Sequence, residues 1–129
     1  MKRLHLAAAL SIAFLVVGCA QTPPAPGGLM DMADRPAEKA LLAGLRAYDD
    51  AQYGPAETQL ALALKTGLAS PRDRAAAHKH LAFLYCTSNR VPDCEAAFRA
   101  ARGDDPAFAL SKAEAGHPLW GPVYKRLQP

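Results

Sequence analysis

The sequence has few of the residues and motifs that carry enzyme chemistry. It contains no glycine-rich phosphate loop, no Gly-x-Ser-x-Gly segment and no His-Glu-x-x-His zinc motif. Only four histidines are present, and His78 and His80 are two positions apart in a predicted helix. Side chains at that spacing point to different sides of a helix, so this pair cannot hold one metal ion. We therefore expect no catalytic site, no metal, no cofactor and no small-molecule substrate.

The chain also lacks a strong net charge and any long apolar run. Its formal charge is only +3 over 129 residues, without the basic stripe that a nucleic-acid partner would require. The apolar run at residues 6–17 is too short for a transmembrane helix, which needs about 20 residues. Because Lys2 and Arg3 precede it, the run has the pattern of a signal-peptide core.

The end of this run, Val16-Val17-Gly18-Cys19, resembles the lipobox of bacterial lipoproteins. The resemblance implies that residues 1–18 are a signal peptide and that a covalent lipid on Cys19 anchors the mature chain to a membrane. Each buried methylene of such a lipid contributes about 0.8 kcal/mol. The alternatives are an ordinary secretory cleavage near Ala20 or an uncleaved anchor.

The residues after Cys19 bear on the choice of membrane. In enterobacterial lipoproteins an Asp after the cysteine favours the inner membrane, whereas Ala20 and Gln21 stand here. The resemblance therefore implies the outer membrane, with the domain facing the periplasm. Four prolines and Gly27-Gly28 lie among residues 20–36. This composition predicts a tether over residues 19–36, partly extended and partly loose, before a helical domain at residues 37–129.

The sequence has only three cysteines. Lipidation of Cys19 would leave Cys86 and Cys94 as a pair in an oxidising compartment, which favours a disulfide. If Cys86 closes one helix and Cys94 begins the next, their Cα atoms can approach the usual range of about 5.5–6 Å. The alternative is a catalytic dithiol or metal pair, although the spacing is not Cys-x-x-Cys.

The apolar pattern after residue 37 predicts an all-α domain. Leu41, Leu45 and Tyr48 recur at helical spacing, and residues 56–64 carry a second stripe. Ser70, followed by Pro71 and an acid in the first turn, predicts the start of a third helix. Residues 75–106 then predict two amphipathic helices joined by a tight loop. We expect a fifth helix over residues 107–115.

The segment from residue 75 to residue 106 resembles a tetratricopeptide repeat, whose period is about 34 residues. The matching residues are Leu81, Ala82, Tyr85, Cys94, Phe98, Ala101 and Pro106. Gly44, Tyr53, Ala56 and Ala63 match the same pattern earlier in the chain. The resemblance departs at His78, where the family often has Trp, and at Cys94, where it usually has Ala. It implies helical hairpins stacked as about two repeats, followed by a C-terminal capping helix.

Repeats of this family bind their partners in a groove lined by the first helix of each repeat. The corresponding residues here are Leu45, Tyr48, Asp49, Lys79, Phe83 and Thr87. An exposed Tyr48 or Phe83 would suit an apolar anchor of a protein partner, whereas either could instead belong to the core. Trp120, the only tryptophan, either covers the last repeat as an apolar plug or forms an exposed docking motif.

The lipobox, the two hairpins and the tail at residues 114–124 together resemble TssQ-type lipoproteins, which are associated with bacterial type VI secretion systems. The resemblance covers most of the mature chain, including the segment from Leu81 to Cys86. It implies a non-enzymatic, lipid-anchored adaptor that binds components of the secretion apparatus. Two alternatives remain. One is a tetratricopeptide lipoprotein of pilus, outer-membrane or cell-wall assembly, and the other is a periplasmic thiol or metal protein that uses Cys86 and Cys94.

Overall fold

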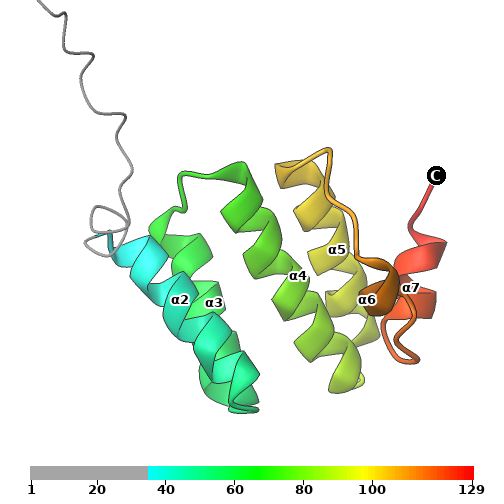
Figure 1. The fold of residues 1–129 in the computed structure, drawn as a ribbon, viewed down its shortest axis with the longest axis horizontal. Coiled ribbons are helices and arrows are strands. Elements are labelled where there is room, and N and C mark those ends of the chain that lie inside the picture. Colours follow the sequence, from blue (N-terminus) through cyan, green and yellow to red (C-terminus); the bar gives the residue numbers. More distant parts are fainter. Residues whose placement is uncertain (1–34) are drawn as a thin grey trace, which may run out of the picture.

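The computed structural model describes residues 35–129, which form stacked helices (Figure 1). The helices of this range are α2 (Pro36–Asp49), α3 (Tyr53–Thr66), α4 (Pro71–Thr87), α5 (Val91–Asp104), α6 (Lys112–Ala115) and α7 (Gly121–Arg126). The expected signal peptide, Cys19 and nearly all of the expected tether lie outside the described residues. Between residues 35 and 129, no helix is both long enough and apolar enough to cross a membrane.

Helices α2 and α3 form the first hairpin. Helix α2 begins at Pro36, because the fixed φ of proline suits the first turn of a helix. The sequence prediction had placed Pro36 at the end of the tether. The hairpin is tightest at Gly44, where an added Cβ would lie 2.8 Å from Cγ of Leu60. Glycine therefore lets the two helix axes approach more closely than any other residue could.

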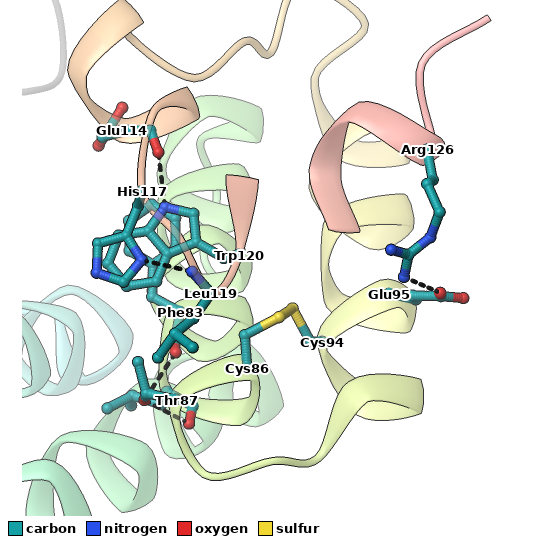
Figure 2. Close-up of a disulfide and its surroundings, with 11 residues drawn as sticks. Phe83, Cys86, Thr87, Cys94, Glu95, Glu114, His117, Leu119, Trp120 and Arg126 are labelled. Carbon is teal, nitrogen blue, oxygen red and sulfur yellow. Dashed lines mark hydrogen bonds and ion pairs between the residues drawn. A yellow bond between two sulfur atoms is a disulfide. The ribbon is translucent and has the colours of Figure 1, made fainter. Parts of the chain in front are cut away.

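Helices α4 and α5 form the second hairpin. Helix α4 begins where the sequence predicted, since the Ser70 hydroxyl accepts a hydrogen bond from the backbone N–H of Asp73 at 3.3 Å. Small residues, Ala82 of α4 and Cys94 of α5, are fully buried. A disulfide joins Cys86 to Cys94, whose Cα atoms are 5.2 Å apart (Figure 2). It ties the end of α4 to the start of α5.

The two hairpins stack through α3 and α4. Arg90, in the loop between α4 and α5, donates to Glu57 of α3 at 2.7 Å and to Asp93 of α5 at 2.9 Å. Its guanidinium also lies 4.1 Å from the centre of the Tyr85 ring, within the range of a cation–π contact. The described residues thus confirm the predicted all-α fold of stacked helical hairpins.

The C-terminal segment corrects one expectation. A single helix over residues 107–115 is wrong, since only Lys112–Ala115 is helical there and a further helix, α7, follows. The Asp105 carboxylate accepts from the backbone N–H of Ala107 at 2.9 Å, an Asx turn that competes with a helix. The helix starts later, where Ser111 and Glu114 form a reciprocal capping box.

Candidate functional site

The C-terminal segment covers the face of α4 on which the sequence placed part of a binding groove. The indole of Trp120 stacks on the Phe83 ring with centroids 4.2 Å apart (Figure 2). Its Nε1–H donates to the backbone oxygen of Glu114 at 2.8 Å, so its polar atom is satisfied. Phe83 is 4% exposed and Trp120 9%. Of the two sequence readings of Trp120, the structure therefore supports the apolar plug.

A second contact holds the tail on α4. The ammonium of Lys79 lies 2.6 Å from Oε1 of Glu114 and 5.7 Å from the centre of the Phe83 ring. Burial alone would raise the pKa of Glu114, but hydrogen bonds from Lys79 and Ser111 to the carboxylate hold it below its ordinary value. Lys79 and Phe83 therefore serve an intramolecular contact rather than an open groove.

The same face remains hollow beyond the tail. A pocket of about 170 Å³ lies where α2 and α4 end, α3 begins and the tail passes. Its walls are aromatic except for one threonine; they consist of Tyr48, Tyr53, Thr87, His117 and Trp120. Both hairpins and the tail thus contribute to it, and it exists only when all three are packed together.

The aromatic rings around the pocket are held by one another. The Tyr48 ring lies 5.9 Å from that of Tyr53 and meets the His80 ring edge-on at 5.1 Å. His80 in turn packs edge-on against Phe83 at 5.9 Å. On the far side, His117 stacks flat on Trp120 at 3.3 Å (Figure 2). Such contacts contribute about 0.5–1.5 kcal/mol per pair beyond area burial, so the pocket walls are pre-organised.

The histidines beside the pocket have defined roles. Nδ1 of His80 lies 2.8 Å from the Ala76 carbonyl oxygen, which can only accept, so Nδ1 carries the proton. Burial lowers the pKa of His80 below its ordinary value, which favours the neutral ring. Nδ1 of His117 accepts from the backbone N–H of Leu119 at 3.2 Å, which fixes the orientation of the ring on Trp120.

Two carboxylates act on Tyr48 in the wall of the pocket. Burial, and then the neighbouring Tyr53 and the carboxylates of Asp49 and Glu114, raise the pKa of Tyr48 above its ordinary value. Asp49 is exposed at the end of α2, directly after Tyr48. Glu114 is compensated by Lys79, whereas Asp49 forms no ion pair within residues 35–129.

The six groove residues carried over from the repeat family are thus divided. Tyr48 and Thr87 line the pocket, and Asp49 is exposed beside it. Leu45 packs against the core, while Lys79 and Phe83 lie under the tail. Three further residues line the pocket that were not predicted there from the sequence, namely Tyr53, His117 and Trp120. Tyr53 was recognisable as the aromatic residue of the loop between the first two helices, but the contribution of the tail had no local signal.

The disulfide pair has little access to solvent. Both Cys86 and Cys94 are buried, and their sulfurs are bonded to each other.

Within the part of the chain that the structure describes, no group of three or more His, Cys, Asp or Glu side chains could hold a metal ion.

A larger hollow of about 310 Å³ lies between α4 and α5, on a stripe that includes Leu81 and Tyr85. The charged groups at its ends are already paired. Arg90 binds Asp93 and Glu57, and His78 lies 3.4 Å from an oxygen of Asp104. Much of the remaining lining is alanine, so this hollow offers fewer directional contacts than the aromatic pocket.

Comparison of the chain with protein-family models, with curated proteins and with solved structures found no match.

Proposed function

We propose that this chain is a lipid-anchored scaffold facing the periplasm from the outer membrane. It binds a protein partner at the aromatic pocket, as an accessory component of a bacterial type VI secretion system. The lipobox-like segment ending at Cys19 supports the anchor, and the resemblance of the mature chain to TssQ-type lipoproteins supports the secretion assignment. No catalysis and no cofactor beyond the lipid are part of the proposal.

The aromatic pocket is the observation that carries the binding function. Its volume of about 170 Å³ is below the 300–1,000 Å³ that is usual for small-molecule sites. A protein segment that inserts one side chain fits this size better than a free ligand. Tyrosine and tryptophan are enriched at the centres of protein interfaces, and Tyr53, which lines the pocket, is 56% exposed.

A competing assignment keeps the scaffold and changes the partner. A lipoprotein of pilus, outer-membrane or cell-wall assembly would use the same anchor and the same helical hairpins. Only the identity of the bound protein separates the two assignments.

The test is recovery of the cross-linked, lipidated protein from its native envelope, followed by mass spectrometry. The proposal predicts recovery of type VI membrane-complex or baseplate components, and loss of that recovery for Tyr53→Ala. Leu62→Ala is the matched control, because Leu62 is 46% exposed and lies on α3 but does not line the pocket. Recovery of pilus or outer-membrane assembly proteins would overturn the secretion assignment. Equal recovery with both variants would overturn the pocket as the binding site.

A further inference from the structure

The size of the aromatic pocket restricts its occupant to a single long side chain. Its walls, Tyr48, Tyr53 and Thr87 with the two rings from the tail, enclose about 170 Å³. Two hydrogen-bond donors in the walls are already occupied within the fold. The Thr87 hydroxyl donates to the carbonyls of Phe83 and Leu84, both at 2.9 Å, and the Trp120 Nε1–H donates to Glu114. The pocket therefore offers ring surfaces, together with the hydroxyl groups of its two tyrosines.

Asp49 lies at the rim of the pocket, where its charge acts on Tyr48 and His80. Asp49 and Asp50 are exposed at the end of α2, beside Tyr48. Neither forms an ion pair with another residue between 35 and 129. Lys79, the cation that lies over the Phe83 ring, is paired with Glu114. Ring faces attract cations through their quadrupole, and the carboxylate of Asp49 adds to that attraction.

The neighbouring turn of α4 already shows this arrangement inside the molecule. Lys79 places its ammonium over the Phe83 ring at 5.7 Å and against the Glu114 carboxylate at 2.6 Å. Phe83 and Thr87 are four residues apart and share one face of the helix. The pocket thus repeats, one turn further along, a set of aromatic rings beside an acid, but none of the described residues that line it is a lysine or an arginine.

We propose that the pocket binds a lysine or arginine side chain from an extended, basic segment of the partner protein. The ammonium or guanidinium lies among the tyrosine rings and is balanced by Asp49 at the rim. This inference rests on the proposed function, since it names the chemistry of the partner that the scaffold binds. It adds a preference for a basic side chain of the partner, which the groove positions of the repeat family do not supply.

The experiment uses the full chain, purified in an uncharged detergent, and its single tryptophan. Because Trp120 lines the pocket, its indole N–H resonance reports occupancy directly. The probes are acetyl-Ala-Ala-X-Ala-Ala-amide peptides with Arg, Lys, Gln or Leu at X. They are titrated to about 10 mM, which covers weak millimolar binding. We expect the Arg and Lys peptides to shift the indole resonance and the Gln and Leu peptides to leave it unchanged.

Charge dependence provides the second readout. Asp49→Asn should weaken binding of the Arg peptide about two- to fivefold, as expected for an exposed charge pair. A similar loss is expected in about 1 M sodium chloride, where the screening length is about 3 Å. Asp73→Asn is the matched control, because Asp73 lies in the first turn of α4, at the opposite end of that helix from Thr87. It should bind like the wild type.

Three results would overturn the inference. They are equal or stronger shifts with the Leu peptide, no shift with any peptide, and unchanged Arg binding in Asp49→Asn. These outcomes are distinguishable from failure of the proposed function. Recovery of a secretion-apparatus protein that depends on Tyr53, together with preference for the Leu peptide, would keep the scaffold and reject the basic anchor. Binding of the Arg peptide, without recovery of any partner that depends on Tyr53, would keep the basic anchor and reject the proposed scaffold function.

Discussion

Truncation of Trp120 to alanine should strongly destabilise the domain. The indole is 9% exposed, stacks on Phe83 and donates to the Glu114 carbonyl. Removing a buried tryptophan side chain costs about 3–5 kcal/mol. That is a large share of the roughly 5–14 kcal/mol expected for the 95 residues that the structure describes, at about 0.05–0.15 kcal/mol each.

The measurement is urea unfolding followed by circular dichroism at 222 nm, a signal that the helical backbone dominates. With an m-value of about 1.5 kcal/mol per molar urea, the midpoint should fall by about 2 M or more. Leu119→Ala is the matched control, because Leu119 adjoins Trp120 but is 53% exposed. It should change stability by no more than about 0.5 kcal/mol.

The result that would refute this reasoning is a loss below about 1 kcal/mol for Trp120→Ala, the mean cost of an arbitrary substitution. Such a result would mean that the tail does not rest on α4 in solution. The face around Phe83 would then be open, and the pocket would lose two of its walls. A comparable loss for Leu119→Ala would also contradict the account, because it would show that the effect is not specific to the buried ring.

Three further changes test other parts of the fold. Gly44→Ala should lower the stability of the domain by about 1–3 kcal/mol through overpacking, because its Cβ would lie 2.8 Å from a side-chain atom of α3. Thermal melts measure this loss. Gly54→Ala is the control and should be tolerated, because nothing lies within 4 Å of its Cβ. Replacing Cys86 and Cys94 with Ser should cost about 2–3 kcal/mol by the chain-entropy relation for a sequence separation of 8, and reduction of the wild type should give the same loss in urea unfolding. The free energy of unfolding should fall as pH drops below about 6.5, because burial lowers the pKa of His80 in the folded state and the unfolded chain therefore binds more protons. Urea titrations at several pH values measure this dependence on pH, and His80→Gln should reduce it.

Each of these outcomes has a clear opposite. Equal melting of the Gly44 and Gly54 variants would contradict the close approach of α2 and α3. Unchanged stability after reduction would show that the disulfide is absent or does not stabilise the fold. A pH slope that persists in full in His80→Gln would assign the acid sensitivity to other groups, such as His78, whose pKa burial also lowers.

The hairpins could be predicted because their signals are local. Helical spacing at Leu41 and Leu45, the Ser70 cap and the small residues at Ala82 and Cys94 each act within a few residues of the chain. Even the late start of α6 had a local signal, since a Ser with Glu three positions on is a capping box. The expectation of a longer helix gave that signal too little weight against composition.

The site could be predicted only in part, because it depends on contacts between distant segments. Whether Phe83 lies in an open groove is decided by Trp120, 37 positions later in the sequence. The groove residues of the repeat family bind a partner only where the groove is open. Here the tail covers two of the corresponding residues, Lys79 and Phe83. Tyr48 and Thr87 remain candidates for partner binding because they line the pocket at the ends of α2 and α4.

The most direct test of the account is site-specific photocrosslinking in the native envelope. A benzophenone side chain replaces Tyr53 in one variant and Leu62 in another. Both positions are exposed on α3, but they are two and a half helical turns apart and therefore face opposite sides. The account predicts a crosslink from position 53 to a basic segment of one partner protein, with none from position 62. A crosslink from position 62 alone, or from both positions equally, would contradict it.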